Sequence, residues 1–575
     1  MSVSIEYQNP QRFDLPRDYI SNFSSSDIVN MDSPWRSELY KPSSACEISP
    51  YQILEAEPLE SEIKALTQFT KDVAETAYDP ENWLYRGNCL RRLGYPELAL
   101  GDVHKARLLV EAALKNDSTL GTDAYKAYSQ RIYQLHQTDP AWMPRKAQVA
   151  TPESLHALVT ILLKRLELQI WSELMEGLMA SNCCADYLVA SREAVARFPD
   201  DKVFPSEVAN AESWFEQRRD ILQGYVDDGE MTTEAMTSTL YNGGVYPTAY
   251  PWMTEDLVTR SDRSIEKVAA EFSSASSNCV VSKSTIRLAS SPEELSEMDV
   301  LGVVAIKDIL AQEPVLVDPT LAAVVDSAGR CPACCGPVLD EVENPCCRTS
   351  YCSSLCSQRA MDSYHTVVCG KDLDFLYETK PVSSSTSTES FIGSKLLLRV
   401  LALSVRENTA NPLQSSLISR LTPAYNPNNP QLIAFNFTDH IITPIRILGE
   451  LGLDVFTNSM YDTWVLHTIH CRLQNNKHGQ GFDDIRGTAI NPLYSMFNHS
   501  CDPNVDWRHD HENSTVTMFA ERNIRKGEEM FISYIGKGDS LKDRQRKLMP
   551  WFGMECACHK CDEEKIEALA AVMTI

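Results

Sequence analysis

The chain has 575 residues, enough for three to four domains at about 150 residues each, so a single small module is excluded. Lys and Arg number 53 against 79 Asp and Glu, a formal net charge of −26. This acidic balance disfavours direct nucleic-acid binding through a basic surface and suits a basic partner. Most of the 18 cysteines fall in two clusters, which indicates metal binding rather than a disulfide-stapled scaffold.

The N-terminal segment is polar and rich in Ser, Asn, Asp and Pro, which predicts a disordered arm over residues 1–50. No stretch has the apolar core of a signal peptide or the roughly 18 apolar residues that a bilayer span needs. We therefore expect no membrane association and a location in the nucleus, the cytoplasm or both.

Helical periodicity follows from about residue 51 to 245, with breaks at Asp79-Pro80 and at Gly94-Tyr95-Pro96. A 34-residue register is typical of tetratricopeptide repeats (TPR). Its first unit comprises Trp83, Gly87, Leu90, Ala99, Val103 and Ala106. Trp171, Leu174, Leu178, Ala194 and Pro199 fit a second, looser unit, with Met175 in place of the glycine. Such an array predicts a groove for a peptide or chaperone partner and no catalytic residue. A plain helical domain with these residues in its core is the alternative.

A first cysteine cluster has the spacing of zinc ligands. Its members are Cys331-x2-Cys334, the adjacent pair Cys346 and Cys347, Cys352-x3-Cys356 and His365-x3-Cys369. Thiolates with one imidazole are the ligands of closed structural zinc sites, and this number saturates two tetrahedral ions. Free thiols or disulfides fit the spacing and an intracellular protein poorly.

A second cluster, Cys556-x-Cys558-x2-Cys561, is one ligand short of a tetrahedron. Cys501 would complete it by folding back, and His559 inside the triplet is a competing ligand. Such a site would pin the tail of the chain over the segment that precedes Cys501.

Asn498-His499-Ser500-Cys501 resembles the Asn-His-Ser-Cys signature of SET-domain protein lysine methyltransferases. Glu528-Glu529-Met530-Phe531-Ile532-Ser533-Tyr534-Ile535 resembles the second signature of that family, and the cysteine-rich insert resembles a MYND zinc finger. Together with the cysteine tail, the chain is similar to the SET and MYND domain-containing group with N-terminal repeats. The resemblance implies an S-adenosyl-L-methionine-dependent protein lysine N-methyltransferase whose substrate is a lysine-containing protein, histone or non-histone.

The resemblance also implies how the zinc ligands divide, with three ions in all. Cys331, Cys334, Cys352 and Cys356 would bind one ion, and Cys346, Cys347, His365 and Cys369 another. The family spaces its third and fourth cysteines by two residues, whereas Cys346 and Cys347 are adjacent. This departure leaves three alternatives open: the pair binds together, Cys335 substitutes, or the second site is distorted or empty.

Methyl transfer from a sulfonium donor needs a neutral amine in line with the S–CH3 bond, so positioning dominates the chemistry. By resemblance, Asn498 and His499 would hold the donor, and Tyr534 would lie beside the transferring methyl and orient the amine. A phenol with a pKa of about 10 orients before it acts as a base. Phe552 would cover the donor or line the lysine channel.

Two further donor contacts rest on the same resemblance. Gly302 marks a donor-binding turn, although Val300 stands where the family has another glycine. An asparagine before the second half of the SET domain often contacts the donor in relatives, which here means Asn475 or Asn476.

The expected fold is an α+β multidomain chain: an N-terminal α-helical TPR-like array, then a SET β-fold split by a MYND-type zinc finger and a helical insert, with a zinc-binding post-SET tail. The predicted parts are a disordered arm (1–50), the repeats (51–245), a linker (246–282), the N-terminal SET part (283–328), the finger (329–370), the helical insert (371–480), the SET catalytic core (481–540) and the post-SET tail (541–575).

A catalytically inactive adaptor, whose finger and repeats bind partner peptides, is the alternative function. The simultaneous presence of Asn498, His499 and Tyr534 favours the enzyme, because an adaptor is expected to have lost at least one of them.

Overall fold

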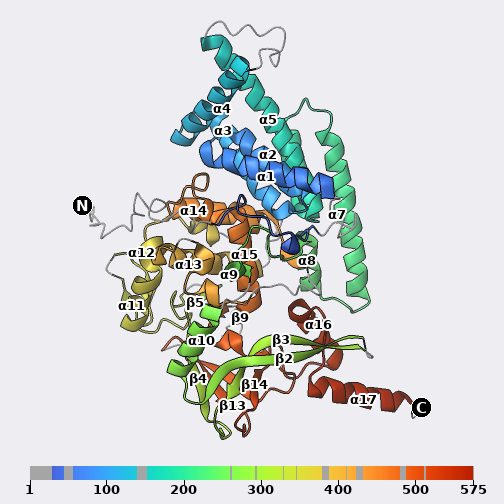
Figure 1. Ribbon diagram of the computed structural model, residues 1–575, viewed down its shortest axis with the longest axis vertical. Helices are drawn as coiled ribbons and strands as arrows, with labels where there is room; N and C mark the ends of the chain where they lie inside the picture. Colours follow the sequence, from blue (N-terminus) through green and yellow to red (C-terminus); the bar gives the residue numbers. More distant parts are fainter. Residues whose placement is uncertain are drawn as a thin grey trace.

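The computed structural model describes residues 29–44, 56–138, 152–258, 262–291, 294–327, 329–344, 346–377, 388–409, 411–422, 432–479, 487–510 and 513–573. In Figure 1 a helical arm forms the upper part of the molecule, and the finger helices α11 and α12 lie at the left. The long β2–β3 hairpin lies at the bottom with α16 and α17. Among the described residues, no helix combines the length and the apolar character that crossing a bilayer requires.

The arm consists of helices that the sequence breaks at expected places: α2 begins at Pro80 after the capping residue Asp79, and α3 begins at Pro96. A Cβ on Gly87 would lie 3.2 Å from the carbonyl oxygen of Ala99, so this glycine lets α2 and α3 approach closely. The arm comprises α1 (Ala56–Glu75), α2 (Pro80–Arg92), α3 (Pro96–Lys115), α4 (Thr119–Thr138), α5 (Pro152–Ala180), α6 (Cys184–Arg197), α7 (Phe204–Asp227) and α8 (Thr233–Tyr241). The helical region agrees with the sequence, while its assignment to TPR repeats stays a prediction.

Residues 29–44 differ from the disordered arm that the sequence predicts. Met31 and Tyr40 are buried, and the Tyr40 hydroxyl donates to the carbonyl of Leu93 at the end of α2. The composition of the segment hides these few apolar side chains, which find partners only in the tertiary structure. Residues 1–28 and 45–50 lie outside the described part of the chain.

The segment expected as a linker, 246–282, is also largely structured. Tyr250 and Trp252 are each 1% exposed and stack with ring centroids 5.1 Å apart. The segment continues into α9 (Glu255–Val258) and α10 (Asp262–Ala275). The Ser-rich run 273–278, a composition typical of linkers, therefore lies partly in a helix. Large aromatic side chains make this segment part of the core because their burial stabilises the fold.

The part of the chain after α10 contains a five-stranded sheet in the order β11-β14-β3-β2-β15. Its strands are β2 (Cys279–Ser291), β3 (Glu294–Ala305), β11 (Asn498–His499), β14 (Glu529–Ile532) and β15 (Glu555–Cys556). β11 and β14 pair in parallel, and the other neighbours are antiparallel. Two three-stranded sheets complete the fold: β12 (Val505–Asp510), β13 (Thr515–Ala520) and β4 (Pro314–Pro319) form one, and β5 (Ala322–Val325), β10 (Gly487–Ile490) and β9 (His478–Gly479) form the other.

The finger, the insert and the tail surround these sheets. The finger holds β6 (Val342–Glu343), β7 (Ser350–Tyr351), α11 (Ser354–Ser363) and α12 (His365–Val368). The insert holds α13 (Thr388–Glu407), β8 (Ile433–Phe435), which pairs with β1 (Gly243–Val245), α14 (Thr443–Glu450) and α15 (Thr463–Asn476). The tail holds α16 (Leu541–Phe552) and α17 (His559–Met573). Arm and insert share one apolar core, since Phe437 and Phe456 cluster with Trp83 and Leu100.

Candidate active site and metal centres

The pairing of β11 with β14 brings the two signature segments together. Nδ2 of Asn498 donates to the carbonyl of Leu301 at 3.1 Å and to Oε1 of Glu529 at 2.8 Å. Oγ of Ser284 donates to the other oxygen of Glu529. The Asn498 amide nitrogen therefore ties β11 to β3 and β14. Glu529 lies within the second signature, but the sequence alone indicates no role for it.

Gly302 lies beside this network. A Cβ at Gly302 would lie 2.3 Å from Oε1 of Glu529, 2.9 Å from Cβ of Ser284 and 3.0 Å from Nδ2 of Asn498. Glycine is required because the Asn498–Glu529 pair packs directly on β3. In the structure, Gly302 therefore leaves room for the Asn498–Glu529 pair on β3.

Tyr534 follows β14 and contacts β11 and the residue directly before it. Its hydroxyl donates to the carbonyl of Phe497 at 2.9 Å, and its backbone N–H donates to Nδ1 of His499 at 3.0 Å. A hydroxyl that donates its one proton to a carbonyl acts toward any further group as an acceptor. The Phe552 ring centroid lies 6.3 Å from that of Tyr534 and 6.0 Å from that of His499. Three of the predicted site residues thus form one aromatic group.

His499 links this group to the tail cluster. The ring is 5% exposed, and burial lowers its pKa to about 4, so it is neutral near pH 7. Because Nδ1 accepts from the Tyr534 backbone, the hydrogen-bond network assigns the ring proton to Nε2, which lies 3.3 Å from Sγ of Cys501. His499 therefore holds Tyr534 and Cys501 in a fixed relation.

Two further polar residues that sequence reasoning missed fix the same region. Nδ2 of Asn504 donates to the carbonyl of Glu529, and its Oδ1 accepts from the backbone of Phe531. Oδ2 of Asp318 accepts from the backbone N–H groups of Leu493 and Tyr494 at 2.8 and 2.7 Å. Asn504 lies near the first signature, but nothing in the sequence connects Asp318 with it.

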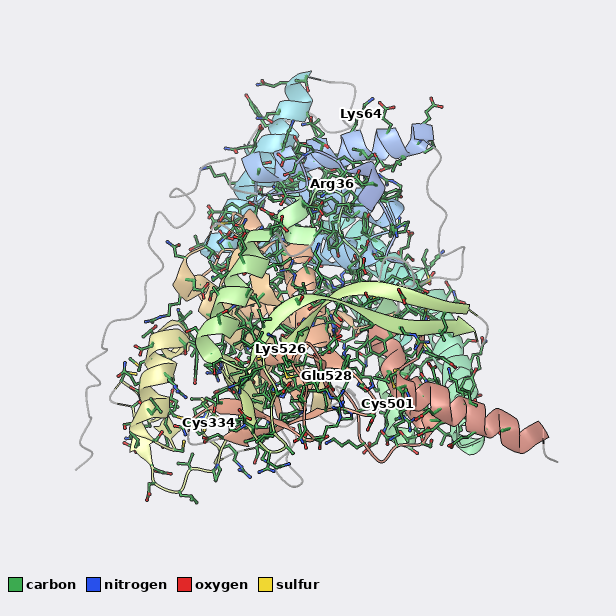
Figure 2. The ribbon with its side chains drawn as sticks, turned by 60° about the horizontal axis from the view of Figure 1, so that its bottom comes forward. Arg36, Lys64, Cys334, Cys501, Lys526 and Glu528 are labelled. Carbon is green, nitrogen blue, oxygen red and sulfur yellow. The ribbon has the colours of Figure 1, made fainter. Side chains whose placement is uncertain are left out.

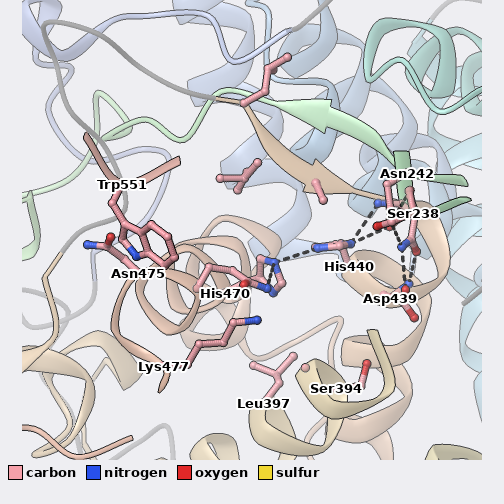
Figure 3. Close-up of a pocket in the computed structure, with 16 residues that line it drawn as sticks. Ser238, Asn242, Ser394, Leu397, Asp439, His440, His470, Asn475, Lys477 and Trp551 are labelled. Atoms are coloured by element: carbon pink, nitrogen blue, oxygen red, sulfur yellow. Dashed lines mark hydrogen bonds between the residues drawn. The ribbon is translucent and has the colours of Figure 1, made fainter. Parts of the chain in front are cut away.

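A cavity of about 440 Å³ opens between the arm, the insert and α16 (Figure 3). Trp551 and Asn475 lie at one end, and Asp439 and Asn242 lie at the other. The Trp551 ring is 6.0 Å from that of Tyr534, so the cavity adjoins the aromatic group. Asn476 is instead bonded to the carbonyls of Thr422 and Arg472. Of the two candidate asparagines, only Asn475 lines this cavity.

Two partly buried histidines form the middle of the cavity wall. Nε2 of His440 lies 2.9 Å from Nε2 of His470, as Figure 3 shows. Burial lowers the pKa of both rings, so one neutral ring donates to the other. The two residues come from separate elements, and no sequence pattern links them.

The structure groups the cysteine and histidine ligands into three sets. Each set has four ligand atoms within 4.8 Å of one another: Cys331, Cys334, Cys352 and Cys356; Cys346, Cys347, His365 and Cys369; Cys501, Cys556, Cys558 and Cys561. Sulfur pairs such as Cys334–Cys352 and Cys501–Cys561 are 3.5 Å apart. Tetrahedral zinc with Zn–S bonds of about 2.3 Å requires an edge of about 3.8 Å, so the sets fit zinc.

Both adjacent cysteines join the second set. Sγ of Cys346 lies 3.1 Å and Sγ of Cys347 3.4 Å from Nε2 of His365. Nδ1 of His365 lies 3.0 Å from the Tyr351 hydroxyl, an arrangement that orients Nε2 toward a metal. Cys335 is fully buried against Ala323 and Ala489, outside the set. The alternative that Cys335 substitutes is therefore wrong in this geometry.

The tail set is completed by Cys501, and the competing ligand His559 does not join it. The His559 side chain is 85% exposed and lies 3.2 Å from a carboxylate oxygen of Glu563. Figure 2 shows Cys334 and Cys501 well apart, so the finger and the tail are separate metal centres.

A profile of the SET domain family matches residues 348–535, which end directly after Tyr534. A SET and MYND domain-containing protein of Dictyostelium discoideum is 25% identical over 45% of this chain and 57% of its own length. Histone-lysine N-methyltransferase SET5 of Yarrowia lipolytica is 36% identical over 13% of this chain and 17% of its own length. Histone-lysine N-methyltransferase ATXR2 of Arabidopsis thaliana is 40% identical over 14% and 18%. The chain spans less than two thirds of the length of each of these relatives.

Proposed function

Since the chain belongs to the SET and MYND domain-containing family, we propose that it is an S-adenosyl-L-methionine-dependent protein lysine N-methyltransferase. The observation that carries the proposal is the position of Tyr534, whose hydroxyl is held by the Phe497 carbonyl directly before β11. Names of relatives that include histone-lysine N-methyltransferase support the same reaction class.

The residues of this chain would mainly position the reactants. The bound donor supplies an electrophilic methyl group on a positively charged sulfur. Tyr534 accepts a hydrogen bond from the lysine amine, because its own proton is held by a carbonyl. Burial of the amine lowers its pKa and favours the neutral, nucleophilic form. Asn498 and His499 keep β11 and Tyr534 in register, and Phe552 excludes water from the aromatic group.

The cavity beside Tyr534 supports donor binding. It combines the carboxylate of Asp439, the amide of Asn475 and the ammonium of Lys477 with the apolar side chains of Leu397 and Leu432. This set suits a zwitterionic ligand with an aromatic base. We propose Asn475 as a donor contact there. Asn498 and His499 do not line this cavity, and we propose that their backbone contacts the donor from the side of the aromatic group. Gly302 contributes by letting Asn498 approach β3.

We further propose three zinc ions, because the three ligand sets are of closed structural type. The substrate is a lysine-containing protein, with histones as the first candidates from the names of relatives. A nuclear or cytoplasmic location agrees with that substrate class. The helical arm is proposed to bind a peptide or chaperone partner through its repeats.

Replacing Tyr534 by Phe tests the catalytic proposal. Tyr534→Phe should lower methyl transfer to lysine peptides at least a hundredfold, because the amine loses its acceptor, while donor affinity stays within about twofold. Transfer is measured with labelled S-adenosyl-L-methionine on a peptide array, and donor affinity by calorimetry.

Tyr133→Phe is the matched control, since this tyrosine on α4 is 53% exposed and far from the site along the chain. Unchanged turnover in Tyr534→Phe would contradict the assigned role. A wild-type protein that neither binds the donor nor methylates any peptide would instead support the non-catalytic adaptor.

A further inference from the structure

A second cavity, of about 350 Å³, lies between the zinc finger and α13 of the insert. We call it the finger–insert cavity. Arg330 and Pro332 from the finger line it, together with Lys371 at the start of the insert and Lys395 and Arg399 from α13. It is distinct from the cavity beside Tyr534, because the two cavities have no lining residue in common.

The finger–insert cavity is basic within an acidic protein. Its basic side chains are Arg330, Lys371, Lys395 and Arg399, and no Asp or Glu occurs among the described residues that line it. The whole chain carries a formal net charge of −26. A local excess of cations in a concave site attracts and concentrates anions.

The two α13 cations are held in place by aromatic, carboxylate and carbonyl partners. Lys395 is 8% exposed, with Nζ 4.5 Å above the Tyr377 ring. Its acid partner Asp326, at 3.4 Å, lies outside the lining residues. Arg399 stacks on the Tyr364 ring and donates through Nη2 to the carbonyl of Pro332.

The remaining amino group of Arg399 indicates a missing partner. Nη1 is buried and has no hydrogen-bond partner among the described residues. Zinc-bound thiolates of the finger would balance part of the charge, but no sulfur accepts a hydrogen bond from Nη1. A buried donor without an acceptor costs stability, so an oxyanion in the cavity would improve the site.

The rest of the cavity wall is mixed. Val325, Leu373 and Leu398 form an apolar part. Cys347, His365 and Cys369 of the second zinc set also line the cavity, so it borders that metal centre. The volume lies in the range of small-molecule sites, larger than an inorganic ion needs. The ligand should therefore carry both an anionic group and an apolar body.

We propose that the finger–insert cavity binds a small organic oxyanion, a molecule with an apolar body and one phosphate or carboxylate group. Lys395 and Arg399 bind the oxyanion, and the aliphatic wall contacts the body. The proposal does not depend on the methyltransferase activity.

The test titrates the zinc-loaded full chain with phenyl phosphate, with benzoate and with the neutral analogue benzyl alcohol, using calorimetry and measuring zinc content before and after. At least one anion should bind saturably, more weakly as salt rises, and benzyl alcohol should not. Lys395→Gln should weaken that binding about tenfold at unchanged zinc content, because one charge-assisted contact is lost. Lys126→Gln, an exposed lysine on α4, should leave it unchanged.

The two anions distinguish the ligand class: stronger binding of phenyl phosphate indicates a phosphate, and stronger binding of benzoate a carboxylate. Absence of saturable binding of both anions would overturn the proposal. Equal binding by wild type and Lys395→Gln would also overturn it, because the anion would then lie elsewhere. Methyl transfer, measured in parallel, reports separately on the proposed function.

Discussion

Glu97 is a buried acid whose surroundings favour its protonated form. It is fully buried on α3, and burial raises its pKa to about 7. Oγ of Ser43 lies 2.5 Å from Oε2 of Glu97 and 3.1 Å from the carbonyl of Gly94. One hydroxyl proton cannot serve both acceptors, so a protonated Glu97 that donates to Ser43 satisfies the whole network.

This protonation predicts a pH dependence of stability. In the unfolded chain the Glu97 carboxyl ionises near pH 4.5, whereas in the folded protein it keeps its proton up to about pH 7. The contribution of Glu97 to the free energy of unfolding is complete below pH 4.5. It decreases as the pH rises to about 7, by up to about 1.4 kcal/mol per pH unit. Glu97→Gln lacks this loss, so its calorimetric unfolding midpoint should rise relative to wild type across that window.

The comparison is internally controlled. Asp318, whose pKa burial also raises to about 7, is present in both proteins and cancels in the difference. If the difference between the two midpoints stays constant with pH, the protonated Glu97 is disproved.

The adjacent cysteines make a second prediction at the residue scale. Cys347→Ser should lower the zinc content by one ion per chain, because the second set loses a thiolate that lies near His365. Cys335→Ser is the matched control and should leave the content at three, since Cys335 packs against alanines. Atomic absorption on purified proteins measures both. Equal zinc in wild type and Cys347→Ser would show that Cys347 is no ligand.

At the scale of elements, α2, α3 and α15 meet in a buried ionic cluster. Arg86 bonds Asp102 at 2.7 Å and Asp462 at 2.9 Å, and Lys105 bonds Asp462 at 2.8 Å. All four side chains are at most 2% exposed, so two cations and two anions balance inside the protein. Burial opposes ionisation of Asp462, but the charges of Arg86 and Lys105 hold its pKa below the ordinary value. The cluster fixes the arm on the insert.

Asp462→Asn should destabilise the protein by about 3–5 kcal/mol, because it leaves buried positive charge without a partner. The same change weakens the cap that Asp462 forms on the backbone of Thr463. Calorimetry should show a lower unfolding midpoint, and hydrogen exchange should rise in α2, α3 and α15.

Glu60→Gln is the control for the loss of a carboxylate. Its pair with Lys64, a residue labelled in Figure 2, is about 70% exposed on both sides and should contribute little to stability, because solvent screens it. A comparable effect of both substitutions would contradict the role of the buried cluster.

For the whole molecule, the metal centres hold the finger and the tail on a fold that is otherwise stabilised by apolar cores. The tail set joins Cys501 at β11 to β15 and α17, and His499 connects it with Tyr534. The arm packs through the apolar core that it shares with the insert and through the ionic cluster. Metal loss should therefore act locally.

Treatment with a zinc chelator should raise hydrogen exchange in residues 331–369 and in α16 and α17, and should abolish methyl transfer, while exchange in α2 and α3 changes little. Re-addition of zinc to treated protein is the control for irreversible damage. A rise in hydrogen exchange of the same size throughout the chain after chelation would contradict a local effect of metal loss.

The sequence by itself determined the helix breaks at Pro80 and Pro96, the spacing of the zinc ligands and the two signature segments, because caps, chelating pairs and strand patterns depend on residues close in the chain. Only the tertiary structure decided that Cys347 and not Cys335 joins the second set, that His440 meets His470, and that Arg86 meets Asp462, 376 residues away. Buried charges and orphan donors find their partners across the whole fold, and no local pattern records those distances.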